Sequence, residues 1–283
     1  MSDKRLRVVL LTHGGTEKAL EYLLALDCAT VAGVFIETQT TRRYTLKEKI
    51  RRSVRYDGYA TTLAKLARAA FNRSRPPGDE GAMLDSRERL RVIAEQHGVP
   101  IHFLTSYHTD DSIALMRAAE ADLGVVLGTN ILKESVFKIP RLGCINLHQG
   151  LAPYYRGGPP VFWELFNGES EVGLTIHFVE TKVDTGEIVL QTTVPLNYDY
   201  SYGLGFESFI ADYRRKLTEP CARLAAEAVR MIAEGSATPR PQDTSLGKRY
   251  RLPVKKEKDE LRRRLRERRL SAQLTVREAS ARD

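Results

Sequence analysis

The sequence has few cysteines and no long apolar run, and both absences exclude classes of protein. Its 283 residues include only three cysteines, Cys28, Cys144 and Cys221. Because they are odd in number and widely spaced, they fit neither a disulfide framework nor a zinc-binding pattern. No run of about 18 or more apolar residues occurs, so no segment is predicted to cross a bilayer. The apolar run at 8–11 is too short for a secretory leader, so we expect a cytoplasmic protein.

Positive charge is concentrated in two segments of the chain. The formal net charge is +8. Residues 42–75 contain 11 basic and 2 acidic residues, and residues 240–269 contain 13 basic and 5 acidic residues. This concentration indicates local anionic partners rather than a uniformly nucleic-acid-binding surface, although solvated helix faces would give the same pattern. Contact with an anionic membrane or a lipid-linked substrate is one hypothesis, which equal partitioning between neutral and anionic vesicles would contradict.

Apolar strand patterns alternate with helical patterns along most of the chain. The first strand–turn–helix–strand unit, at 5–36, is the start of a parallel sheet and indicates an α/β protein. Further strands are predicted at 99–104, 122–127, 142–148, 173–179 and 187–194. Helices are predicted at 86–98, 109–119, within 202–234 and at 255–270. A basic stretch at about 41–85 interrupts the alternation, and we expect it to be a helical insertion.

The segment 144–158 carries the most chemical information. If 144–148 is a strand, its alternation places the side chains of Asn146 and His148 on the same face. The Gly- and Pro-rich loop that follows would lie at the carboxyl end of this strand, where open α/β sheets bind ligands. Another predicted strand runs into a turn that presents Asp184. An amide, an imidazole and a carboxylate at one strand edge indicate an acyl-transfer site.

Several ordered motifs in this region are similar to those of a known enzyme family. The motifs lie at 122–128, 143–148, 151–153, 156–157, 173–177 and 183–189. In this order and at these separations they resemble the folate-dependent formyltransferases, which include the methionyl-tRNA, glycinamide-ribonucleotide and sugar-amine N-formyltransferases. The similarity in layout extends over about residues 5–235. It implies a Rossmann-like fold, with a mostly parallel sheet and helices on both faces.

The resemblance also implies a reaction and the residues that perform it. The family transfers the formyl group of N10-formyltetrahydrofolate to a primary amine, and its catalytic Asn, His and Asp fall on Asn146, His148 and Asp184. Asn146 and protonated His148 would donate hydrogen bonds to the oxyanion, and His148 would also move the protons. Asp184 would either orient the imidazole and raise its basicity or hold a water that relays the proton. No metal is expected.

The resemblance places the formyl donor between two loops that flank the catalytic residues. Expected in this pocket are Thr129, Asn130, Ile131, Leu132, Glu180 and Val183. Acceptor binding is predicted for His13, Gly14, Gly15, Tyr154, Arg156 and Gly157. The two glycines of the first turn could cradle a phosphate at a helix N-terminus, although a plain turn is the alternative. His177 is expected to pack in the core.

The acceptor is the open question. We expect a catalytic domain at 1–235 and a basic helical tail at 236–283. Methionyl-tRNA formyltransferases carry a C-terminal β-barrel, which the 49 residues from 235 to 283, without an alternating strand pattern, do not suffice to build. A small amine acceptor such as an amino-sugar nucleotide is therefore predicted. Methionyl-tRNA is the runner-up because the basic segments could bind RNA, and a formyltetrahydrofolate hydrolase and a non-catalytic binding module are further alternatives.

Overall fold

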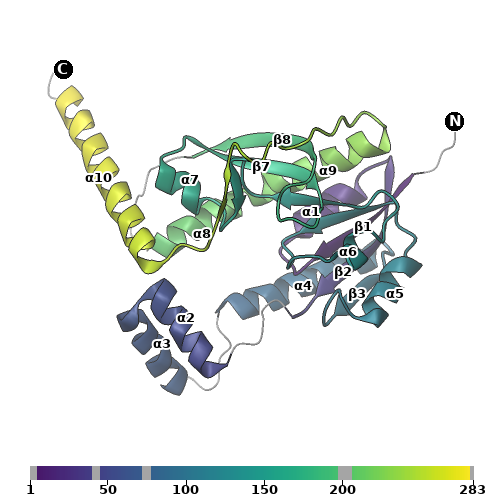
Figure 1. Cartoon of the computed structure of the whole chain (residues 1–283), viewed down its shortest axis with the longest axis horizontal. Coiled ribbons are helices and arrows are strands. Elements are labelled where there is room, and N and C mark those ends of the chain that lie inside the picture. The colour runs from purple at the N-terminus through teal and green to yellow at the C-terminus, as the bar shows by residue number, and fades with distance from the viewer. Residues whose placement is uncertain (1–4, 40–44, 72–77, 197–205, 281–283) are drawn as a thin grey trace.

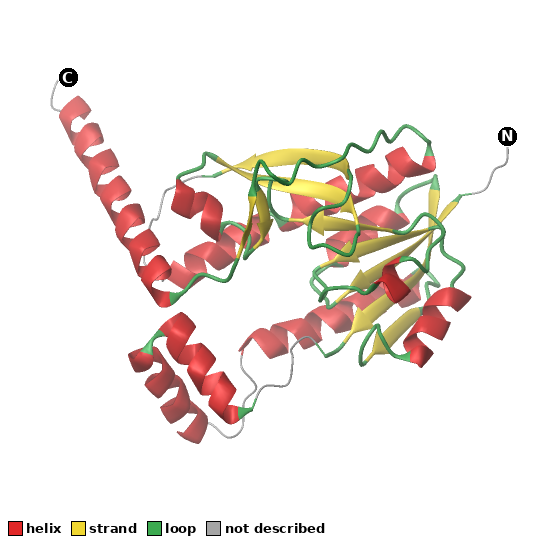
Figure 2. Cartoon of the chain, in the orientation of Figure 1, coloured by secondary structure: helices red, strands yellow, loops and turns green. Residues whose placement is uncertain are grey.

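A seven-stranded sheet forms the centre of the molecule (Figures 1 and 2). The computed structural model describes residues 5–39, 45–71, 78–196 and 206–280. The strands, in their order across the sheet, are β3 (Ile101–Leu104), β2 (Ala29–Glu37), β1 (Leu6–Thr12), β4 (Leu123–Leu127), β5 (Cys144–His148), β7 (Glu171–Phe178) and β8 (Ile188–Pro195). The first five are parallel, and β7 and β8 are antiparallel to their neighbours at one edge. The predicted α/β fold with a mostly parallel sheet is confirmed.

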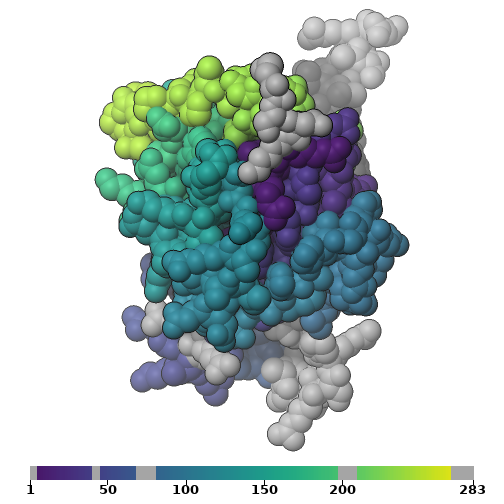
Figure 3. Space-filling model, turned by 90° about the vertical axis from the view of Figure 1, so that its right-hand side faces the viewer, coloured from purple at the N-terminus to yellow at the C-terminus, as the bar shows by residue number. Residues whose placement is uncertain are grey.

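Both faces of the sheet are buried, because alternate side chains of each central strand enter two different cores. Val8 and Leu10 of β1 belong to one core, whereas Val9 and Leu11 belong to the other. The first core is covered by α1 (Glu17–Leu24), α4 (Gly78–Gln96), α7 (Phe162–Asn167) and α9 (Thr218–Ala233), and the second by α5 (Asp110–Ala118) and α6 (Glu134–Phe137). This two-sided burial explains why the central strands read as continuous apolar runs. Figure 3 views the molecule from the right-hand side of Figure 1, where the blue and teal parts of the chain form much of the surface.

The basic insertion forms a helical hairpin of α2 (Leu46–Asp57) and α3 (Tyr59–Phe71), followed by α4. Thr45 and Glu48 form a capping box at the N-terminus of α2. The hairpin lies beside the base of α10 (Lys255–Ser280), which projects from the body of the molecule (Figure 1), and Lys258 Nζ lies 3.4 Å from Asp57 Oδ1. Parts of the predicted insertion, at 41–44 and 72–77, lie outside the described residues.

The helix predicted within 202–234 is divided in two. The structure has α8 (Phe206–Lys216) and α9, which are separated at Leu217, and 202–205 lie outside the described residues. Pro220 explains the division, because it has no amide hydrogen to donate to the carbonyl of Lys216 and its ring would crowd that carbonyl. A single continuous helix was therefore the wrong prediction.

A second, two-stranded sheet joins the loop after β5 to the C-terminal part of the chain. It pairs β6 (Tyr155–Gly157) with β9 (Lys248–Tyr250) in parallel. No alternating pattern after residue 235 indicated this strand, since a three-residue strand is too short to show one. The tail helix itself is present as α10 and is longer than predicted.

Over the described residues, no helix is long and apolar enough to cross a membrane.

Candidate active site

Asn146 and His148 lie at the end of β5, which pairs with β4 on one side and with β7 on the other. The antiparallel register places His177 of β7 directly opposite Asn146. The Asn146 Nδ2 amide donates to His177 Nε2 at 3.2 Å, while His177 Nδ1 donates to the Phe178 carbonyl at 2.8 Å. His177 is buried, as expected, but it also contacts the candidate catalytic residues. The β5–β7 register, which the sequence does not specify, was needed to find this contact.

Two acceptors bracket the imidazole of His148. Its Nε2 donates to the Tyr155 carbonyl oxygen at 2.6 Å, and its Nδ1 lies 3.4 Å from Asp184 Oδ2. Burial lowers the pKa of His148, while the negative charge of Asp184 and the Tyr155 carbonyl act in the opposite direction. The doubly protonated ring can satisfy both acceptors, whereas the neutral ring can donate to one of them. The contacts therefore suit a histidine that gains and loses a proton.

Asp184 lies between the two imidazoles. Its Oδ1 is 3.4 Å from His177 Nε2, and its Oδ2 accepts the Gly157 amide at 2.8 Å. Burial alone would raise the pKa of Asp184, but its contact with His177, the charge of His148 and the Gly157 amide outweigh it and lower the pKa to about 2. The backbone of Asp184 has a φ of 55°, a conformation that Asp tolerates better than most residues. The turn therefore presents an ionised carboxylate to His148.

The sharp loop after β5 depends on Gly150. A Cβ at this position would lie 2.5 Å from His148 Nε2 and 2.5 Å from the Tyr155 carbonyl oxygen. Both atoms of the His148–Tyr155 hydrogen bond would then have to move. A glycine two residues after the histidine is therefore required for this contact.

Replacing Asp184 with Asn is expected to lower the free energy of unfolding by about 2 kcal/mol near pH 7. The pKa of this carboxyl falls from 3.8 to about 2 on folding, and each unit corresponds to about 1.4 kcal/mol. Because the folded protein has the lower pKa, this stabilisation is present above about pH 4 and is lost as the pH falls towards 2. Urea unfolding of both proteins from about pH 7 to pH 3 should show the difference shrinking. A difference that does not change with pH would argue against an ionised Asp184.

Two cavities meet at the Asn146–His148 pair. The smaller has a volume of about 290 Å³, and the larger has a volume of about 580 Å³. Asn146, His148, Thr129 and Gly158 line both of them. A group bound in one cavity therefore meets a group bound in the other beside the amide and the imidazole.

The residues predicted to bind the formyl donor all line the smaller cavity. They are Thr129, Asn130, Ile131, Leu132, Glu180 and Val183. Gly157, predicted on the acceptor side, lies here too. The structure thus brings the two predicted loops together on either side of Asp184, and their contact with folate stays a prediction.

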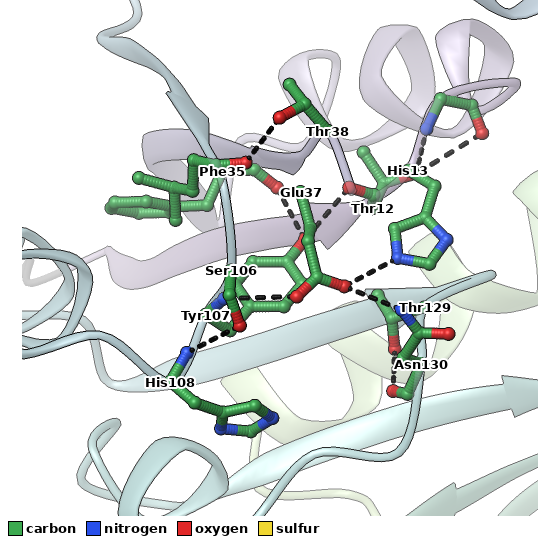
Figure 4. Close-up of polar contacts among 12 residues, drawn as sticks. Thr12, His13, Phe35, Glu37, Thr38, Ser106, Tyr107, His108, Thr129 and Asn130 are labelled. Carbon is green, nitrogen blue, oxygen red and sulfur yellow. Dashed lines mark hydrogen bonds and ion pairs between the residues drawn. The ribbon is translucent and has the colours of Figure 1, made fainter. Parts of the chain in front are cut away.

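Glu37, at the end of β2, anchors one of these loops (Figure 4). Its Oε2 accepts from Asn130 Nδ2 at 3.0 Å and lies 2.8 Å from His13 Nε2, and its Oε1 accepts from the Tyr107 amide at 3.2 Å. The residue is only 3% exposed. Burial alone would raise the pKa of Glu37, but the bonds from His13, Asn130 and Tyr107 outweigh it and hold the pKa below its usual range. His13 therefore packs on Glu37 and lines neither cavity at the Asn146–His148 pair.

The remaining predicted acceptor residues are divided between different places. Gly14 and Gly15 line the larger cavity, but their amides already donate to the Thr12 and Ser86 hydroxyls. Tyr154 lines a separate pocket. Arg156 donates to backbone carbonyls of its own loop and of the C-terminal segment. The structure brings neither of these two side chains into the cavities beside Asn146 and His148.

Comparison with known proteins supports the predicted family. A model described as formyl transferase matches residues 81–203. The methionyl-tRNA formyltransferase of Citrifermentans bemidjiense is 33% identical over 158 residues, which make up 56% of this chain and 47% of that protein. Over this region the chain is similar to formyl transferases, which supports the predicted family. It spans about half the length of the curated relatives it matches.

Solved structures of formyltransferases share the fold. The glycinamide ribonucleotide transformylase 1 of Symbiobacterium toebii matches with a TM-score of 0.53 and 22% identity, covering 86% of this chain and 96% of that one. A sugar N-formyltransferase from a Shewanella species matches with a TM-score of 0.54 and 13% identity, covering 87% and 76%. At these identities the likeness shows the fold alone. It confirms the predicted Rossmann-like formyltransferase fold.

Within the described part of the chain, no group of three or more His, Cys, Asp or Glu side chains is arranged to hold a metal ion.

Proposed function

We propose that this protein transfers the formyl group of N10-formyltetrahydrofolate to a primary amine. The observation that carries the proposal is the position of Asn146 and His148, which line both cavities where these meet. A two-substrate transfer needs this arrangement, because donor and acceptor must approach the same donor groups from different sides. We further propose that the enzyme is cytoplasmic.

The chemistry follows from the contacts of these side chains. The amine nitrogen bonds to the formyl carbon while the bond from that carbon to N10 of the folate breaks. The amine loses a proton and N10 gains one, so His148 acts first as a base and then as an acid. Asn146 donates an amide hydrogen to the oxyanion, and the second hydrogen of the same NH2 group can remain bonded to His177. Asp184, ionised beside His148, stabilises the imidazolium that forms.

The smaller cavity is proposed to hold the folate. Backbone groups of 129–132 and 180–184 would bind the polar edge of the pteridine, and Leu132, Val126 and Val179 provide apolar surface in the same cavity. No residue of this set would take part in bond breaking. Their role is to place the formyl carbon beside Asn146 and His148.

The larger cavity is proposed to take the acceptor amine. Among the described residues that line it, none is an Asp, Glu, Lys or Arg. A phosphate or carboxylate inside it would meet no Lys or Arg among these described residues, so we place the charged parts of the acceptor outside while a neutral amine-bearing group enters. The absence of a carboxylate also favours the unprotonated amine, which is the form that attacks.

A small molecule with one amine, such as an amino-sugar nucleotide, is our first candidate acceptor. The amine-bearing sugar would enter the neutral cavity while the phosphates remain in solvent. Methionyl-tRNA is the second candidate, because the curated relatives that match this chain carry that name and because the chain has two basic segments. An aminoacyl group would place its amine in the cavity in the same way.

The test is formyl transfer from N10-formyltetrahydrofolate to amino-sugar nucleotides, glycinamide ribonucleotide and methionyl-tRNA, with a reaction lacking amine as control. Amine-dependent release of tetrahydrofolate, with the formylated product identified by mass, is the expected result. Equal release without any amine would show a hydrolase in place of a transferase. No turnover with any acceptor, although folate binds, would contradict the proposed transfer to these amines.

A further inference from the structure

Residues 240–250 run along the surface and contact the start of β8, the turn that carries Asp184, and strand β6. Arg240 and Ile188, at the start of β8, exchange two backbone hydrogen bonds, of 2.8 and 3.0 Å. Gln242 Nε2 donates to the Gly186 carbonyl at 2.6 Å, in the turn that carries Asp184. The segment then reaches β9, which pairs with β6. It lies beyond the region 81–203 that matches the family model.

Strand β9 pairs with β6, and β6 carries two backbone groups that contact His148 and Asp184. Register partners are Tyr155 with Lys248 and Gly157 with Tyr250. Polar backbone groups of successive residues in a strand point to opposite edges, so residues 155 and 157 of β6 share one edge and residue 156 faces the other. The shared edge faces the site, because the Tyr155 carbonyl accepts from His148 and the Gly157 amide donates to Asp184.

Hydrogen bonds from Arg156, a stacked pair of tyrosines and a close backbone approach at Gly247 hold the segment in place. Arg156 donates to the Thr244 carbonyl at 3.1 Å and to the Gly247 carbonyl at 3.5 Å, and to Pro153 in its own loop at 3.1 Å. The rings of Tyr155 and Tyr250 stack with centroids 5.1 Å apart and an interplanar angle of 5°. At Gly247, a Cβ would lie 2.1 Å from the Pro153 carbonyl oxygen.

We propose that residues 240–250 are a positioning element of the active site, which keeps the Tyr155 carbonyl on His148 and the Gly157 amide on Asp184, with Arg156 as the side chain that fastens it. This inference deepens the proposed function and rests on it. Most residues of the segment are exposed, so its attachment depends on a limited number of contacts, which also include the bond from Asn167 Nδ2 to the Tyr250 hydroxyl and the packing of Trp163 on Tyr250. A small change at one of them should therefore displace β6 while the core stays folded.

The test compares Arg156→Met with Arg156→Lys and with a control outside the segment, Arg215→Met. Arg215 lies on α8, its side chain is 76% exposed, and it pairs with Asp212 on the surface of the same helix. The Met variant is expected to lower kcat by about 10-fold or more, because small displacements of catalytic groups are costly, while the KM for folate changes little. Lys keeps one donor and should recover part of kcat, and the control should equal the wild type. A raised KM for the amine with unchanged kcat would instead make Arg156 an acceptor-binding residue and overturn the proposal.

The second readout does not need turnover. Titration of the His148 imidazole by NMR should give a lower pKa in Arg156→Met than in wild type, because the Tyr155 carbonyl favours the charged ring. An unchanged His148 pKa in a folded Arg156→Met protein would show that Arg156 has a purely structural role, and would overturn the proposal. If formyl transfer itself is not found, this titration still decides the positioning role separately from the proposed function.

Hydrogen exchange of the wild-type protein covers the case in which the variant does not fold. If the segment holds β6, the Gly157 amide should exchange no more slowly than the amides of Lys248–Tyr250, since opening of β9 releases both. A Gly157 amide that stays protected while β9 exchanges freely would overturn the proposal.

Discussion

Asn146→Ala and His148→Ala should each lower the turnover of formyl transfer by about 10²–10⁴-fold without unfolding the protein. Both side chains lie where the two cavities meet, and each supplies a group that acts only in the transition state: an amide donor for the oxyanion and an imidazole for the protons. Single-turnover kinetics with a saturating amine would measure the loss. Asp184→Asn should also lose rate while still binding folate, because its carboxylate acts through His148.

His97→Ala is a suitable control for these variants. His97 is an exposed histidine just after the end of α4, and its ring contacts the backbone carbonyl of Ile93 in that helix. It should retain wild-type turnover. Thermal unfolding and folate binding close to wild type in the Asn146 and His148 variants would confine the effect to chemistry. Near-normal turnover in either variant would remove that residue from the mechanism.

Glu37→Ala should lower the free energy of unfolding by about 3–5 kcal/mol. The buried carboxylate contacts three donors, from His13, Asn130 and the Tyr107 amide, and its removal leaves them without this acceptor. Because Asn130 lies in the loop that lines the smaller cavity, we also expect weaker binding of formyl-folate. Urea unfolding would measure the first effect and a folate titration the second.

Glu95→Ala is the matched comparison for Glu37→Ala. Glu95 pairs with Arg91 on the surface of α4, and both side chains are exposed. Surface pairs of this kind contribute about 0.2–1 kcal/mol, so this variant should be nearly as stable as wild type. Equal losses of stability in the two variants would contradict a special role for the buried Glu37 cluster.

Much of the site could be predicted because local spacing determines it. Alternation along 144–148 places Asn146 and His148 on one face, and the order of the motifs along the chain is enough to recognise the family. The central strands were predictable for a similar reason: parallel strands covered on both faces are continuous apolar runs. Pro220 could also have predicted the break between α8 and α9, although the amphipathic pattern on both sides of it suggested a single helix.

The sequence by itself therefore determined the fold class, and it was enough to predict the family and the Asn–His–Asp set. Only the tertiary structure decided which groups surround that set. His177 meets Asn146 through an antiparallel register between strands distant in the chain, and Glu37 reaches Asn130 across 93 positions. The Tyr155 carbonyl and the Gly157 amide are backbone groups. Every residue carries a carbonyl and every residue except proline an amide hydrogen, so their roles leave no mark in the sequence. Residues 240–250 show the same limit, because short strands and backbone hydrogen bonds have no periodic pattern, and only the folded chain brings them to the site.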